Sequence, residues 1–69
     1  MYRTSVSSSN LVSVGYENGI LEIEFHDGSI YQYHNIPDHI YRGLMSASSK
    51  GTYLDQYVKK AGYSYTKIR

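Results

Sequence analysis

Hydrophobic and polar residues alternate in three successive stretches of the first half of the chain. Each stretch has the period of two residues that a β-strand with one buried face produces. Short segments containing Gly, Asn or Asp separate the stretches, and these residues favour tight turns. The sequence therefore predicts three consecutive antiparallel strands. The residues predicted to face inward are Val12, Val14 and Tyr16, then Leu21, Ile23 and Phe25, and then Tyr31 and Tyr33.

The first turn is predicted at Asn18-Gly19. These two residues tolerate the positive φ angles that a two-residue type I′ turn requires. The turn fixes the register of the first two strands, and because side chains alternate along a strand, all the large apolar residues then share one face. The predicted pairs are Tyr16 with Leu21, Val14 with Ile23, and Val12 with Phe25.

The second turn has two possible lengths. A two-residue loop at Asp27-Gly28 would place Tyr31 and Tyr33 on the polar face of the sheet. A three-residue loop that starts at His26, with Gly28 at positive φ, keeps one apolar face. We therefore predict the three-residue loop, with both tyrosines packed inward rather than forming an exposed stacking platform, and a solvated polar face opposite. The predicted pairs are Phe25 with Ser29, Ile23 with Tyr31, and Leu21 with Tyr33.

The second half of the chain predicts two short helices and an extended segment. Pro37 suits the first position of a helix over residues 37–48, whose apolar residues recur along one stripe. Ser49 is the predicted N-cap of a second helix, which Gly62 ends. The alternating segment 63–69 can add an edge strand to the sheet or remain free.

These patterns predict an α+β fold, in which a three-stranded antiparallel meander is covered on one face by two short helices, with the extra C-terminal edge strand as an option. The 69 residues form a single domain, and residues 1–8 are a segment that can be flexible. The chain has no cysteine, no secretory signal pattern and no apolar run of membrane-spanning length. We expect a cytoplasmic protein without membrane association.

Charge is distributed unevenly, although the net charge is only +1. Residues 1–40 contain one basic and five acidic residues, a net charge of −4, whereas residues 41–69 contain six basic and one acidic residue, a net charge of +5. An anionic partner is therefore expected to bind the second half.

Six short segments distributed over residues 6–68 form a distinctive set: SSNLVSVGY, LEIEF, DGSIYQY, IPDHIY, ASSKGTYLDQYV and YSY. The most specific parts are Tyr31-x-Tyr33, Ile36-Pro37 and the run from Ala47 to Tyr53. This set resembles the KTSC domain, a short bacterial and phage module named for its occurrence at the C-terminus of some lysyl-tRNA synthetases. The resemblance implies a small α+β fold in a cytoplasmic setting, and it suggests RNA binding without a characterised activity. Leu54 and Asp55 depart from the Phe and Asn that many members carry.

A nucleic-acid site is predicted in the second half. At residues 48–53 a serine-rich turn enters a helix beside Lys50, and free N–H groups at helix starts accept phosphate. A simple N-cap at Ser49 is the more ordinary explanation of this turn. The basic and tyrosine residues around it suit single-stranded RNA or DNA, although lysines near a helix end also complement its dipole. The predicted site residues are Arg42, Ser48, Ser49, Lys50, Gly51, Lys59, Lys60, Tyr63, Tyr65, Lys67 and Arg69.

Two functions from different classes follow from this sequence. The first is a small non-enzymatic module that binds RNA or single-stranded nucleic acid through its basic half. The alternative is a protein-interaction or assembly module that uses the outer sheet face, on which Ile20 and Ile30 are predicted to be exposed. The histidines and acids do not converge in the predicted register, so we expect no catalytic site, no metal site and no cofactor.

Overall fold

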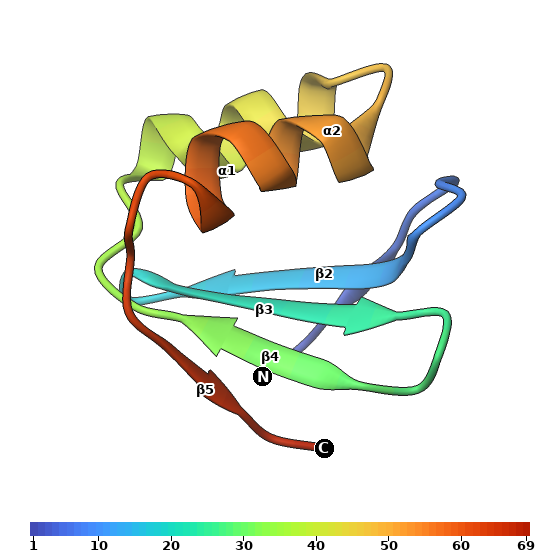
Figure 1. Ribbon diagram of the computed structural model, residues 1–69, viewed down its shortest axis with the longest axis horizontal. Helices are drawn as coiled ribbons and strands as arrows, with labels where there is room; N and C mark the ends of the chain where they lie inside the picture. The colour runs from blue at the N-terminus through green and yellow to red at the C-terminus, as the bar shows by residue number, and fades with distance from the viewer.

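The computed structural model describes residues 1–69 as a five-stranded antiparallel sheet with helices over one of its faces (Figure 1). The strands lie in the sheet in chain order, β1-β2-β3-β4-β5. The elements are β1 (Thr4–Ser5), β2 (Leu11–Glu17), β3 (Ile20–Phe25), β4 (Ile30–Tyr33), α1 (Asp38–Ser46), α2 (Lys50–Leu54), the π-helical turn η1 (Asp55–Lys59) and β5 (Tyr65–Lys67). The predicted α+β fold is therefore confirmed, and the predicted meander, β2 to β4, gains one short strand at each edge.

Both predicted turns are present. Asn18 and Gly19 have φ angles of 52° and 79°, as a type I′ turn requires. Gly28 has a φ of 90°, and the Phe25 amide donates to the Ser29 carbonyl at 2.9 Å, which closes the three-residue loop. The strands accordingly keep the predicted register, with pairs Tyr16–Leu21, Val14–Ile23, Ile23–Tyr31 and Leu21–Tyr33.

One predicted pair is wrong. Phe25 lies opposite Leu11 rather than Val12, because a β-bulge between Leu11 and Ser13 adds a residue to β2. Leu11 is fully buried, whereas Val12 is only half-buried. The Val12 carbonyl accepts a hydrogen bond from the Val6 amide at 3.1 Å. The bulge therefore ties the N-terminal segment to β2.

The hydrophobic core lies between the sheet and the helices. Tyr33 is 4% exposed, so its predicted inward packing is confirmed. Tyr31 is half-buried at the border of the core, so the same prediction holds only in part. The other buried members of the core are Leu11, Val14, Leu21, Ile23, Ile36, Leu44, Leu54 and Val58.

An aromatic pair joins the sheet to the first helix. The rings of Tyr16 on β2 and Tyr41 on α1 are stacked, with centroids 4.6 Å apart. The Tyr16 hydroxyl donates to the Ile36 carbonyl at 2.5 Å. Pro37 is the N-cap of α1 rather than its predicted first residue, so the helix begins one residue later than predicted, at Asp38. The helix is thereby fixed close to its beginning.

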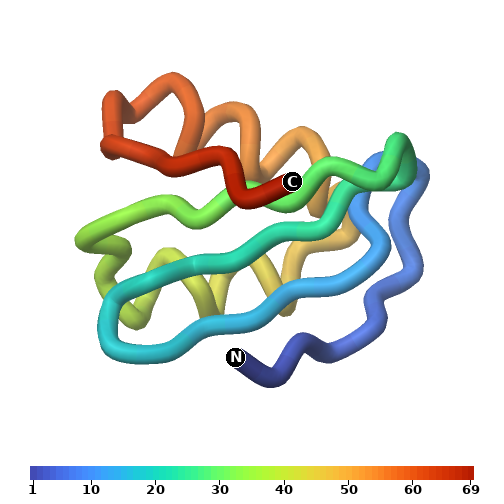
Figure 2. The backbone as a smooth tube through the Cα atoms, turned by 90° about the horizontal axis from the view of Figure 1, so that it is seen from below, coloured from blue at the N-terminus to red at the C-terminus, as the bar shows by residue number.

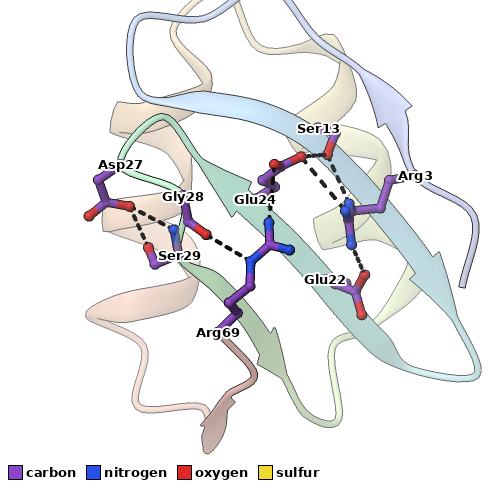
Figure 3. Close-up of polar contacts among 8 residues, drawn as sticks. All are labelled: Arg3, Ser13, Glu22, Glu24, Asp27, Gly28, Ser29 and Arg69. Atoms are coloured by element: carbon purple, nitrogen blue, oxygen red, sulfur yellow. Dashed lines mark hydrogen bonds and ion pairs between the residues drawn. The ribbon is translucent and has the colours of Figure 1, made fainter.

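The outer sheet face is covered at its centre, contrary to the solvated face that we predicted. Ser13 and Glu22 are both buried, because β1 pairs with β2 and brings Arg3 across them. Arg3 donates to the Ser13 hydroxyl at 2.9 Å and forms an ion pair with Glu22 (Figure 3). A Cβ atom at Gly15 would lie 2.7 Å from the Tyr2 carbonyl, so this close approach needs a glycine. Residues 1–8 thus contribute the strand β1 and cover the centre of the outer sheet face.

The C-terminal segment forms the opposite edge of the sheet beside β4 (Figure 2). This arrangement also corrects the prediction that Ile30 is exposed. Ile30 is 6% exposed, because its backbone pairs with Ile68 and Arg69, and the Arg69 side chain crosses the outer face to Glu24 (Figure 3). Ile20, the other residue of the predicted apolar patch, is half-buried. Neither residue of the predicted apolar patch is therefore fully exposed.

No helix of the structure is both long enough and apolar enough to cross a membrane.

Candidate functional site

An open groove lies on the inner side of the sheet, next to the end of the helical layer. It has a volume of about 740 Å³, within the range of small-ligand sites. The sheet provides Phe25, Tyr31 and Tyr33, while Leu54 and Lys59 lie on the helical side. The C-terminal segment closes the groove with Tyr63 and Tyr65. Parts of the chain that are far apart in sequence therefore build one aromatic surface.

The aromatic rings of the groove are in mutual contact. Tyr65 lies 5.7 Å from Tyr31 and 5.9 Å from Tyr33 between ring centroids, and Phe25 meets Tyr31 edge to face at 5.8 Å. Such distances are typical of favourable aromatic pairs. Tyr33 is enclosed, but Tyr65 is 62% exposed. The cluster is therefore anchored in the core at one end and open to a ligand at the other.

Two lysines lie over these rings. Lys59 Nζ is 5.1 Å from the Phe25 centroid, and Lys67 Nζ is 6.0 Å from the Tyr31 centroid. Both distances are in the range of cation–π contacts. Neither lysine forms an ion pair, whereas Lys60 pairs with Asp55 at 3.4 Å. The two ammonium groups at the groove therefore keep their charge available for an anion.

The first of these lysines, Lys59, is the last residue of the π-helical turn η1. In η1 the Lys60 amide donates to the Asp55 carbonyl at 2.9 Å, a bond that spans five residues instead of four. Val58 in the same turn is buried, and Lys59 beside it is exposed at the groove. π-helical turns are rare and occur frequently at functional sites.

The turn between β3 and β4 forms a polar end of the groove. One oxygen of Asp27, Oδ1, accepts hydrogen bonds from the Ser29 amide at 2.9 Å and from the Ser29 hydroxyl at 2.6 Å (Figure 3). The bonds from the Ser29 side chain and backbone hold the pKa of Asp27 below its ordinary value, and Lys67 lowers the pKa further. Asp27 is therefore a carboxylate at neutral pH.

At the predicted helix-start site, the side chains of Ser49 and Lys50 make internal contacts. The Ser49 hydroxyl donates to Thr52 Oγ1 at 2.8 Å, and Lys50 Nζ donates to the Ala47 carbonyl at 2.9 Å. Ser49 is the N-cap by position but makes no side-chain capping bond. The side chains of Ser49 and Lys50 thus bond to groups of the same turn, and Ser48 beside them is exposed.

The other predicted residues divide between the groove and the rest of the surface. Gly51, Lys59, Tyr63 and Tyr65 line the groove, and Lys67 adjoins it over Tyr31. Arg42 instead pairs with Asp38 at 2.7 Å along α1, and Lys60 pairs with Asp55. Arg69 lies on the outer face, where it donates to the Gly28 carbonyl at 3.3 Å and pairs with Glu24.

Ten of the fourteen groove residues were absent from the predicted site, among them Phe25, Asp27 and Ser29. Phe25 was predicted as a core residue, and the turn residues were considered only for their backbone. No sequence signal near Asp27 indicates that a segment some forty residues later closes a groove beside it. Elsewhere, no three His, Asp or Glu side chains lie close enough together to hold a metal ion.

Comparisons with known proteins agree with this fold. The KTSC domain model matches residues 7–63. An uncharacterized protein of Stutzerimonas stutzeri (strain A1501) is 39% identical over 70 residues, covering 99% of each chain. The crystal structure of a KTSC domain protein from Yersinia pestis has a TM-score of 0.88 and 39% identity, and the match covers 99% of this chain and 97% of that one. This chain belongs to the KTSC domain family.

Proposed function

We propose that this protein is a non-enzymatic module that binds single-stranded nucleic acid, RNA in particular, in the aromatic groove. The observation that carries the proposal is the position of Lys59 and Lys67, two lysines without ion pairs that lie over aromatic rings at the groove. Modules that bind single strands combine cations for the phosphates with aromatic rings on which bases stack.

The pairing of charges elsewhere strengthens this assignment. Four of the six acidic residues are held in ion pairs, namely Glu22, Glu24, Asp38 and Asp55. The basic residues without an ion pair are Lys50, Lys59 and Lys67. Two of these three are at the groove, so the positive charge left for a partner is concentrated there.

The exposed ring of Tyr65 supplies a surface for a base. It is 62% exposed, and the rings of Tyr31 and Tyr33 support it from the sheet. Because every nucleobase has a flat π-face, stacking of this kind tolerates different sequences. The absence of cysteine fits a reducing compartment, so we place this activity in the cytoplasm.

The proposal is tested by titrating dye-labelled single-stranded RNA and DNA octamers at two salt concentrations. The variant that carries Lys59→Gln and Lys67→Gln should bind about tenfold more weakly. The slope of log affinity against log salt should become shallower by roughly 1.4, because each lost phosphate contact contributes about 0.7 on single strands. Lys60→Gln is the matched control, since Lys60 pairs with Asp55 away from the groove.

Two results would refute nucleic-acid binding at this site. One is that the wild-type protein fails to bind either octamer at low salt. The other is that the double variant binds as tightly as Lys60→Gln. The alternative of a protein-interaction module on the outer sheet face is less favoured, because Ile30 is buried and the glutamates of that face are paired with Arg3 and Arg69.

A further inference from the structure

The turn between β3 and β4 brings two hydrogen-bond acceptors, the Asp27 carboxylate and the Ser29 hydroxyl oxygen, to the polar end of the groove, which Ser9, Asn10 and His26 also line. Asp27 Oδ1 is occupied by Ser29, but Asp27 Oδ2 has no hydrogen-bond or ion-pair partner. The Ser29 hydroxyl proton is directed to Asp27 at 2.6 Å, so the Ser29 oxygen can offer only its lone pairs to a ligand. A ligand edge at this end of the groove therefore meets two neighbouring acceptors, one of them charged.

Nucleobases differ in the edge that they offer to such a pair. Guanine carries two adjacent N–H donors, the ring N1–H and the exocyclic 2-amino group. Adenine and cytosine carry one amino donor next to an acceptor nitrogen. Uracil carries one N–H between two carbonyl oxygens, which a carboxylate repels. Guanine is thus the base whose edge suits two acceptors side by side.

We propose that the groove prefers guanine, stacked on its aromatic rings with the donor edge toward Asp27 and Ser29. This inference rests on the proposed function and adds a base preference to it. The charges of the groove agree with this arrangement, because the carboxylate repels phosphate while Lys59 and Lys67 attract it. The base and the phosphate of a guanine nucleotide therefore each have a partner of matching chemistry at the groove.

The carboxylate is also held in place before a ligand arrives. Two hydrogen bonds from Ser29 fix its orientation, and the short loop is closed by the bond from the Phe25 amide to the Ser29 carbonyl at 2.9 Å. Because these groups are fixed by the turn, little ordering entropy remains to oppose recognition. The lowered pKa of Asp27 keeps the acceptor charged at neutral pH.

The test compares oligouridine strands that carry one central guanosine or one central inosine. Inosine lacks only the 2-amino group, and a single guanosine in a uridine strand does not form quadruplexes. The wild-type protein should bind the guanosine strand about tenfold more tightly, the effect of losing one hydrogen bond to a charged group. The same comparison with deoxyribose strands should show the same preference, since the ribose is not involved.

Asp27→Asn is the decisive variant, because its carbonyl oxygen can still accept from Ser29 while the second acceptor becomes a donor. It should bind both strands with equal affinity. Asp55→Asn, outside the groove, should keep the wild-type preference. Equal binding of guanosine and inosine by the wild type overturns the guanine assignment alone, as does a preference that Asp27→Asn retains. A wild type that binds no strand overturns the proposed function and this inference together.

Discussion

The rings of Tyr31 and Tyr65 lie 5.7 Å apart across the last two strands of the sheet, tilted by 51°. Tyr31 is half-buried against the core, whereas Tyr65 is 62% exposed. The core thus supports a ring that remains open to a ligand. Tyr31 therefore contributes to the stability of the fold, and Tyr65 provides surface for binding. The two contributions can be tested with separate variants.

Replacing Tyr65 with alanine should weaken binding of single-stranded nucleic acid by about 1–3 kcal/mol without unfolding the protein, because a stacking surface is lost. Circular dichroism and a fluorescence anisotropy titration measure the two properties. Tyr57→Ala is the matched control, since Tyr57 is 50% exposed but packs against the Tyr53 ring, and neither residue lines the groove. Equal losses of affinity in both variants would contradict a role for Tyr65 in stacking.

Tyr33 should make the protein sensitive to alkali. Burial, together with the neighbouring hydroxyls of Tyr31 and Tyr65, raises the pKa of Tyr33 from 10.0 to about 12. The unfolded chain releases this proton more readily, so the contribution of Tyr33 to stability is complete below pH 10 and is lost as the pH rises through about 12. Urea unfolding across this range should show a smaller loss for Tyr33→Phe than for the wild type. Parallel curves for the two proteins would exclude this linkage.

Arg3→Ala should destabilise the protein at neutral pH by about 1–3 kcal/mol, because it leaves the buried Glu22 without its ion pair. Burial alone raises the pKa of Glu22, but hydrogen bonds from Gln32 and Arg3 outweigh it and hold the pKa below 4.5. The stabilising effect is therefore present above pH 4.5 and disappears as acid protonates the carboxylate. Urea unfolding at neutral and acidic pH measures this difference.

The control for this experiment is Arg42→Ala, which removes the exposed pair with Asp38. Exposed pairs contribute about 1 kcal/mol or less. If Arg42→Ala cost as much as Arg3→Ala, the cover over the outer face would have no special role in stability.

Gly28→Ala should cost roughly 1–2 kcal/mol, since an L-residue is strained at a φ of 90°. No atom lies within 4 Å of an added Cβ, so backbone strain is the only source of the loss. Asn18→Gly is the control, because Asn18 already has a φ of 52° and glycine accepts that conformation readily. Chemical unfolding of both variants provides the measurement, and a Gly28→Ala protein as stable as the wild type would be the contrary result.

The parts of the fold that sequence could predict are those set by local geometry. Asn18-Gly19 and Gly28 determine two loop lengths, and these lengths determine the register of three strands. The bulge could not be predicted in this way. Leu11 and Val12 are both apolar, so a period of two is consistent with either facing inward, and the choice depends on the backbone bond between Val6 and Val12.

The groove was less accessible to sequence reasoning, because its parts meet only in the folded chain. The basic and aromatic composition of residues 41–69 drew attention to Lys59, Tyr63 and Tyr65, and these three residues line the groove. The partners Phe25 and Asp27 come from the acidic half of the chain. Pairing of Arg42 and Lys60 with acids on their own helices is a matter of side-chain geometry that composition does not reveal.

The short strands at the two edges of the sheet affect whether separate molecules can aggregate by pairing their strands. β1 has two residues and β5 has three, and basic residues lie beside or within them at Arg3 and Lys67. Long, flat edges invite strands of other molecules to join the sheet, whereas short and charged edges discourage it. Neither edge offers a template for continued strand addition, so the sheet resists growth into aggregates even though its interior strands are rich in β-branched and aromatic residues.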